Sequence, residues 1–254
     1  MKIAFDAGHG KDNNNGIPGV ISEHEFNASV VKYCVELAKF NEFEVVLTQP
    51  LYDIGIPLIE RTNIAIRNKV DALVSIHADW NTDENVRGYW NFYWHNNKNS
   101  KILANIWIKY AKQMLSTINK GSMTSEPGKW TDFHMVRVPA TNYLHRFPAI
   151  LCECGFMSNK QDLELLLTDS YRRLCAEVTV IALCEFFGKE YRKPMFEDVP
   201  KNHYSREAIE RVVRNEIMVG VKEKEIFGFG QPLKREDFAV VIDTILQKLS
   251  WYKK

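Results

Sequence analysis

The chain opens with MKIAFDAGHG (Met1–Gly10), in which the apolar run Lys2–Ala7 ends at the glycines that flank His9. Beyond it, short apolar runs typical of buried strands alternate with segments whose apolar residues recur at helical spacing. The further strand-like runs are Phe43–Thr48, Asp71–His77, Gly88–Trp94 and Phe147–Phe156. The helical segments are Glu25–Phe40, Leu58–Asn68, Ser100–Leu115, Gln161–Leu167 and Ser170–Phe187. This alternation predicts an α/β fold, with a mostly parallel sheet flanked by helices.

The composition excludes several classes of protein. The 254 residues carry a formal net charge of +1, so neither a nucleic-acid partner nor another polyanion is expected. No run approaches the roughly 20 apolar residues of a membrane helix, so no membrane insertion is expected. An odd number of cysteines in a chain of this size favours reduced, buried thiols over a disulfide framework. They are Cys34, Cys152, Cys154, Cys175 and Cys184.

A change in composition divides the chain. Residues 1–187 form the predicted α/β domain, and residues 188–194 (GKEYRKP) are charged, contain a proline and are predicted to be a linker. Residues 195–254 then form a small helical module, with helices predicted at Arg206–Asn215 and Arg235–Leu249. Two helices this short are marginally stable alone, so we expect the module to pack on the main domain or to form a dimer.

Two histidines follow predicted strands, where parallel sheets bind ligands: His9 in DAGHG and His77 in SIHAD. A catalytic zinc ion takes three protein ligands, and two histidines with one glutamate make such a set. Glu23 and Glu25 are the candidate glutamates. From spacing alone, histidines with a structural role are the commoner interpretation of this pattern.

Five motifs occur in a particular order: DAGHG, SEHEFN, LIERTNIA, DALVSIHAD and PAILCECGFMSN. In this order they resemble the family 3 N-acetylmuramoyl-L-alanine amidases of bacterial autolysins and phage endolysins, from about Met1 to Phe187. The resemblance implies one zinc ion held by His9, Glu23 and His77. It selects Glu23 over Glu25, because Asn27 lies four residues after Glu23.

The resemblance also implies that Glu153, in ECGF, is the catalytic glutamate. Its apolar surroundings would raise its pKa, which suits a group that accepts and donates a proton. A buried carboxylate in a structural ion pair is the alternative. Alternation along a strand places Cys152 and Cys154 on the face opposite Glu153, so packing is the preferred interpretation of both cysteines over a metal site.

Other candidates near the site follow from the same motifs. Arg61 matches an arginine of the family's L-x-x-R motif, and a structural role is expected for it. His134 and Arg137 precede the strand of Glu153 and are candidates for contact with the substrate or the ligands. Four aromatic side chains could stack on sugars, although core packing is the preferred interpretation. They are Tyr89, Trp90, Tyr93 and Trp94.

The C-terminal segment, from about Met195 to Leu249, resembles an S-layer homology module. The similarity rests on motifs such as Phe196–Pro200 (FEDVP) and on KRED at residues 234–237, where the module usually has T-R-A-E. It implies binding of secondary cell-wall polysaccharide, with Arg235 and Asp237 as the candidate residues. The alternative is a structural helix pair with no ligand.

Together these features predict zinc-dependent hydrolysis of the amide bond between N-acetylmuramic acid and L-alanine in peptidoglycan. Met1–Gly10 has no signal-peptide pattern, so we expect a cytoplasmic protein that is later released to the cell wall, as a phage or prophage endolysin. A bacterial autolysin, a wall-binding protein without activity and a zinc peptidase acting on the stem peptide are the alternatives.

Overall fold

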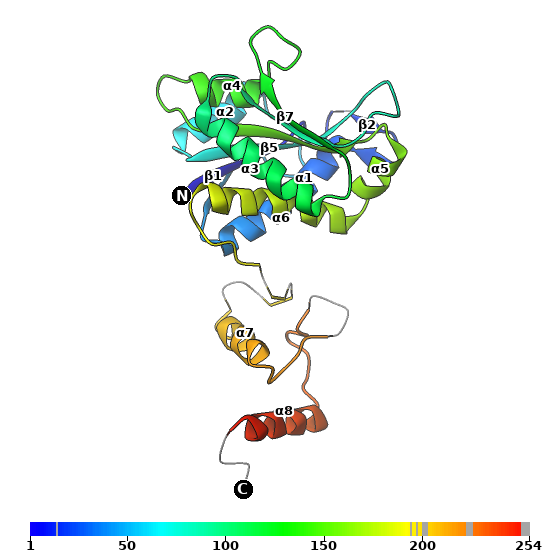
Figure 1. Ribbon diagram of the computed structural model, residues 1–254, viewed down its shortest axis with the longest axis vertical. Helices are drawn as coiled ribbons and strands as arrows, with labels where there is room; N and C mark the ends of the chain where they lie inside the picture. The colour runs from blue at the N-terminus through cyan, green and yellow to red at the C-terminus, as the bar shows by residue number, and fades with distance from the viewer. Residues whose placement is uncertain (14, 194, 197, 200–202, 222–225, 250–254) are drawn as a thin grey trace. The chain divides into compact units, whose positions relative to one another are not determined.

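In the computed structural model, a six-stranded sheet in the order β4-β1-β5-β8-β6-β7 forms the centre of residues 1–192 (Figure 1). The strands are β1 (Lys2–Ala7), β4 (Glu44–Leu47), β5 (Ala72–Asp79), β6 (Tyr89–Trp94), β7 (Asn119–Ser125) and β8 (Ala149–Phe156). The first four strands in the spatial order are parallel to one another, whereas β6 runs antiparallel to β8 and parallel to β7. The predicted α/β fold with a mostly parallel sheet is therefore confirmed.

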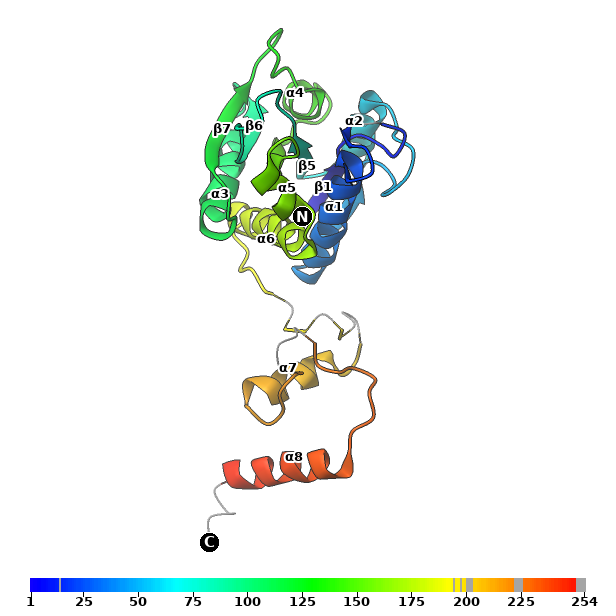
Figure 2. The ribbon, with the colours of Figure 1, turned by 90° about the vertical axis from the view of Figure 1, so that its right-hand side faces the viewer.

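Helices cover both faces of the sheet. One face packs on α1 (Glu23–Phe40), α3 (Lys98–Met114) and α6 (Asp169–Phe186), and the other on α2 (Leu58–Arg67) and α4 (His134–Thr141). In Figure 2, α3 lies beside β6 and β7. Successive strand residues enter different cores: Phe5 joins the first, and Ala4 the second. Burial on both faces explains why the strands read as nearly continuous apolar runs.

Four elements of the first unit were not predicted. The edge strand β7 has the polar sequence NKGSMTS, so its pairing with β6 comes from backbone hydrogen bonds rather than from apolar alternation. The helix α4 contains Pro139, which ordinarily disfavours a helix interior. The hairpin of β2 (Gly16–Ile17) and β3 (Ile21–Ser22) is only two residues long on each side. The helix α1 begins at Glu23, two residues earlier than predicted.

The interpretation of the cysteines and of most strand aromatics as core is confirmed. All five cysteines are free and buried. Cys152 and Cys154 belong to the core under α1, α3 and α6. Tyr89, Tyr93 and Trp94 are also buried, whereas Trp90 is only partly so. Among the described helices, none has the length and apolar character needed to cross a membrane.

The structure describes residues 1–13, 15–193, 195–196, 198–199, 203–221 and 226–249. The chain divides into two compact units, Met1–Arg192 and Lys193–Lys254. The first residues of the predicted linker belong to the first unit, where the Arg192 N–H donates to Asn41 Oδ1 at 2.7 Å. Pro194 of that linker, and Glu197 and Pro200 of the FEDVP motif, lie outside the described residues.

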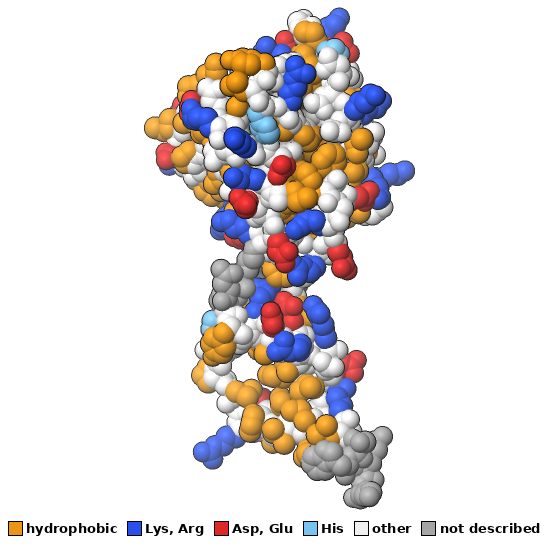
Figure 3. Space-filling model, turned by 90° about the vertical axis from the view of Figure 1, so that its left-hand side faces the viewer, with side chains coloured by type: hydrophobic (Ala, Val, Ile, Leu, Met, Phe, Trp, Pro, Cys, Tyr) orange, Lys and Arg blue, Asp and Glu red, His pale blue; other side chains and the backbone are white. Residues whose placement is uncertain are grey.

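The second unit contains α7 (Arg206–Arg214) and α8 (Arg235–Lys248). A small core joins Phe196, Val199 and Ile209. Asp198 ties this core together, because its carboxylate accepts hydrogen bonds at 2.6–2.7 Å from the backbone N–H groups of residues 227–229. Burial opposes ionisation of Asp198, but these N–H donors outweigh it and lower the pKa of its carboxyl. In contrast, α8 buries no side chain, and apolar side chains gather on the surface of this unit (Figure 3).

Asp162, in α5 (Lys160–Leu166), is a buried carboxylate that joins several segments of the first unit. Its Oδ2 accepts from the backbone N–H groups of Gly88 at 2.6 Å and Phe156 at 3.1 Å. Its Oδ1 accepts from Thr117 Oγ1 at 2.5 Å and pairs with Arg87 Nε at 3.3 Å. One side chain therefore fixes the start of β6 against the end of β8.

We predict that Asp162→Ala lowers the free energy of unfolding by about 3–5 kcal/mol, because it leaves a partly buried arginine and two backbone donors without their acceptor. Urea unfolding followed by circular dichroism measures the change. The matched control is Glu164→Ala, an exposed carboxylate on the same helix, which should change stability by less than about 0.5 kcal/mol. Equal losses in the two variants would contradict this role of Asp162.

Candidate active site

The turn after β1 brings His9 over the carboxyl end of the sheet. His9 has a φ of 62°, in the left-handed region that few residues other than glycine adopt. A Cβ atom on Gly8 would lie 2.2 Å from Cε1 of His77, and one on Gly10 would lie 2.1 Å from the backbone nitrogen of Gly55. Glycine is therefore required on both sides of His9 for close packing.

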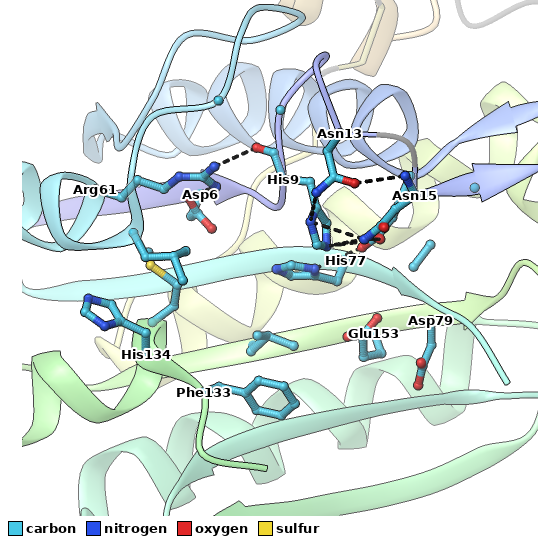
Figure 4. A pocket seen from close by; sticks show the side chains of 18 of the residues that line it. Asp6, His9, Asn13, Asn15, Arg61, His77, Asp79, Phe133, His134 and Glu153 are labelled. Carbon is cyan, nitrogen blue, oxygen red and sulfur yellow. Dashed lines mark hydrogen bonds and ion pairs between the residues drawn. The ribbon is translucent and has the colours of Figure 1, made fainter. Parts of the chain in front are cut away.

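His9, Glu23 and His77 form a group that could hold a metal ion. Figure 4 shows the side chains of His9 and His77 close together. His9 Nε2 lies 3.1 Å from Glu23 Oε2, and His77 Nδ1 lies 3.0 Å from Glu23 Oε1. One ligand atom from each of the three residues lies within 4.8 Å of the other two. Tetrahedral zinc with bonds of about 2.0–2.1 Å separates its ligand atoms by about 3.3 Å, so the set fits zinc.

Glu23 is buried between the imidazoles of His9 and His77. Burial opposes its ionisation, but hydrogen bonds from His77 and His9 outweigh this effect and hold the pKa of the Glu23 carboxyl well below its usual range. Asn27, one helical turn later, donates to Glu23 Oε1 at 3.4 Å and to the Gly8 carbonyl at 3.1 Å. Asn27 thus links the helix that carries Glu23 to the turn that carries His9.

A buried network of charged and polar side chains holds the turn that carries His9. Asp6 accepts hydrogen bonds from Thr48 Oγ1 at 2.5 Å and Ser75 Oγ at 2.6 Å, and it lies 3.4 Å from Nη1 of Arg61. Arg61 Nη2 donates to the His9 carbonyl at 2.8 Å. The expected structural role of Arg61 therefore has a concrete form, since this side chain holds the backbone of His9.

Glu153 lies beside His77, its register partner across β5 and β8. Its Oε2 is buried and has no hydrogen-bond partner among the described residues. Burial raises the pKa of the Glu153 carboxyl well above its usual range, and the carboxylates of Asp79 and Glu23 act in the same direction. Within the described parts of the chain no ion pair of Glu153 is found, so its surroundings differ from those of the structural alternative.

A cavity of about 950 Å³ lies at the carboxyl ends of the parallel strands. The residues that line it include His9, Glu23, His77, Glu153, His134 and Trp80. His134 also lies 3.2 Å from Thr62 Oγ1, and burial lowers the pKa of its imidazole.

The remaining predicted residues lie elsewhere. Arg137 does not line the cavity and pairs with Asp132 at 2.8 Å. Arg235 and Asp237 belong to the first turn of α8, in the second unit.

Sequence reasoning missed several polar groups around the site. His24 donates from Nδ1 to the Gly8 carbonyl at 2.9 Å, and Asn15 Nδ2 lies 3.3 Å from the His9 ring nitrogens. Ser75 lies 3.2 Å from His77 Nε2, and Asp79 accepts from Trp90 Nε1 at 2.8 Å. Ser75 and Asp79 could have been found, because each lies two residues from His77 on a strand and so shares its face.

The model of the family described as N-acetylmuramoyl-L-alanine amidase matches residues 3–185. The chain belongs to this family. The amidase resembles AmiC of Neisseria meningitidis serogroup B, with 25% identity over 209 residues, 69% of this chain and 50% of that protein.

Solved structures of amidases are similar to this chain. The CwlV catalytic domain from Bacillus (Paenibacillus) polymyxa var. colistinus has 26% identity and a TM-score of 0.64, covering 75% of this chain and 99% of that chain. AmiC2 of Nostoc punctiforme has 23% identity and a TM-score of 0.65, covering 74% and 98%. The activity of the chain is therefore that of a peptidoglycan amidase.

The packing of Gly8 on His77 makes a prediction for the amidase. In Gly8→Ala the new Cβ atom displaces the His77 imidazole, and a displacement of about 1 Å should lower kcat/KM on peptidoglycan about 100-fold. Release of soluble fragments measures activity, and circular dichroism reports folding. Gly19→Ala is the control for backbone strain without a clash: its φ of 74° disfavours alanine, but no atom lies within 4 Å of a Cβ there, so it can lose stability while keeping kcat/KM. Full activity in Gly8→Ala would rule out the proposed steric requirement.

Proposed function

We propose that the amidase is zinc dependent and holds one zinc ion through His9, Glu23 and His77. Three features support the proposal: two imidazoles and one carboxylate form a donor set typical of catalytic zinc, the pKa of the carboxyl lies well below its usual range, and all three residues line one cavity. The observation that carries it is the convergence of these ligand atoms within 4.8 Å. Bound zinc would polarise the amide carbonyl and lower the pKa of a bound water.

We assign proton transfer to Glu153. Its carboxylate accepts a proton from the attacking water, whose oxygen bonds to the lactyl carbonyl carbon. The carbon–nitrogen bond then breaks, and Glu153 gives the proton to the leaving nitrogen of L-alanine. The raised pKa of Glu153 suits both halves of this exchange, and its unpartnered Oε2 leaves an acceptor available in the cavity.

Purified amidase should release free N-terminal L-alanine from Gram-positive peptidoglycan, lose this activity on chelation and regain it with zinc. Glu153→Gln keeps the shape but cannot carry the proton, so we expect activity to fall at least about 100-fold while zinc content stays at one ion per chain. His9→Ala should lose the zinc. Elemental analysis and end-group analysis make the two measurements.

Glu36→Gln, an exposed carboxylate on α1, is the matched control and should behave as the parent protein. New termini within the stem peptide would favour a zinc peptidase instead. A folded, zinc-loaded parent that releases nothing would favour a wall-binding protein without activity.

We further infer that residues 195–254 bind secondary cell-wall polysaccharide. The resemblance to an S-layer homology module supports this role, and so does the exposure of Arg235 and Asp237 in the first turn of α8. Dimerisation, through which a single module would gain avidity, stays a prediction. The endolysin role and release from the cytoplasm also stay predictions.

Wall binding can be measured by co-sedimentation with intact walls in the Glu153→Gln background, which prevents digestion. Adding Arg235→Ala should weaken binding at least about tenfold, because a charge-assisted contact is lost. Arg211→Ala, an exposed arginine on α7, is the control. Unchanged binding in Arg235→Ala, or equal binding to walls stripped of polysaccharide, would contradict this role.

A further inference from the structure

Two tryptophan side chains near the cavity are far more exposed than is usual for this residue. The exposed fraction is 69% for Trp130 and 53% for Trp80, although tryptophan is highly buried on average. Trp80 lines the cavity itself. Trp130 contacts Phe133, which lines the cavity, with ring centroids 6.3 Å apart. An exposed aromatic surface therefore continues outward from the active site.

The Trp130 side chain is held in place. Its ring packs on that of Trp90, with centroids 6.0 Å apart and an interplanar angle of 39°. Its loop, between β7 and α4, is fixed by Ser125, whose Oγ donates to the Thr131 carbonyl at 2.5 Å and accepts from the Phe133 N–H at 3.1 Å. A rigid aromatic side chain loses little entropy on binding, so this surface is organised in advance for a ligand.

Trp90 connects Trp130 to the reacting groups. It is the register partner of Glu153 across β6 and β8, and its Nε1 donates to Asp79 at 2.8 Å. Figure 4 shows the side chains of Phe133, Asp79 and Glu153 around the same cavity. The surface formed by Trp90 and Trp130, called here the indole platform, thus begins beside Glu153 and ends in solvent.

A positive charge accompanies the indole platform. The Lys120 ammonium lies 4.9 Å from the centroid of a Trp90 ring and 5.5 Å from that of Phe156. An ammonium over aromatic faces is held by their quadrupoles. Its charge also attracts an anionic group on a molecule that lies over the platform.

Two parts of the substrate could lie on such a surface: the glycan strand and the stem peptide. The apolar C–H face of a pyranose ring covers a flat indole and removes it from water, whereas an alanine-rich stem carries no ring. Each cleavage also leaves a lactyl carboxylate on a muramic acid of the strand. An indole platform with an adjacent ammonium therefore matches a glycan strand from which some stem peptides have already been removed.

We propose that the indole platform and Lys120 form a subsite for the glycan strand, next to the muramic acid whose amide is cut. The proposal rests on the amidase function and names the part of the substrate that lies outside the cavity. Trp130 then binds the longer glycan strands and takes no part in the chemical step.

The test compares two soluble substrates: a single N-acetylmuramoyl peptide and a tetrasaccharide carrying stem peptides. For Trp130→Ala we expect KM on the tetrasaccharide to rise about fivefold to tenfold, with KM on the single-sugar substrate and kcat on both unchanged. Trp130→Phe should keep most of the affinity. Tyr143→Ala, an 87% exposed aromatic of the same unit, is the control and should change neither substrate.

Equal rises in KM on both substrates would overturn the proposal in favour of contact with the stem peptide or the cavity, and unchanged KM on both would also overturn it. Failure of the amidase function is separate, because the parent protein would then release no L-alanine from either substrate. Binding of peptide-free glycan chains, measured by calorimetry, still tests the subsite in that event, and Trp130→Ala should weaken it about fivefold to tenfold.

The role of Lys120 is tested separately, by comparing KM on two tetrasaccharides. Lys120→Gln should raise KM for a tetrasaccharide whose second muramic acid bears a free lactyl carboxylate, and leave KM unchanged when that carboxyl is still joined to a peptide. An equal effect on both tetrasaccharides would remove the carboxylate contact from the proposal.

Discussion

Backbone hydrogen bonds between β5 and β8 place His77 opposite Glu153, and the pairing of β1 with β5 places the turn of His9 beside them. Because side chains alternate along a strand, this register puts His77 and Glu153 on the face toward α2 and α4, and Ile76 and Cys152 in the opposite core. A slip of one residue would exchange the two sets. The register is therefore fixed by apolar burial, and the candidate site residues His77 and Glu153 are aligned as a consequence.

The same edge concentrates buried acidic groups, which is costly unless each has a partner. Asp6 has Arg61 and two hydroxyl donors, and Glu23 has two imidazoles. Glu153 lacks such partners among the described residues, and besides burial the carboxylates of Asp79 and Glu23 raise the pKa of its carboxyl. Unsatisfied groups of this kind cluster at functional sites, where a bound cation or substrate completes them.

The two halves of the sheet have different tasks in this arrangement. The parallel strands β1, β5 and β8 carry or lead into the groups proposed to act on the amide bond, and the helices α1 and α2 hold the turn of His9 through Asn27 and Arg61. The reversed pair β6 and β7, with the loop that leads to α4, carries the aromatic surface. The site lies on rigid strands and the aromatic surface lies partly on a loop. Substrate recognition can therefore vary while the chemistry stays constant.

The sequence by itself predicted β1, β4, β5, β6 and β8 and five of the helices of the first unit, and with the family resemblance it named His9, Glu23, His77 and Glu153 as the candidate site. Local apolar patterning specifies buried elements, and ordered motifs identify the family even at about 25% identity. It did not reveal β7 or α4, whose polar or proline-containing sequences are stabilised by neighbours rather than by their own propensity. Only the tertiary structure placed Arg61 on the His9 carbonyl and Trp130 on Trp90, because these contacts join segments far apart in the chain and leave no local pattern.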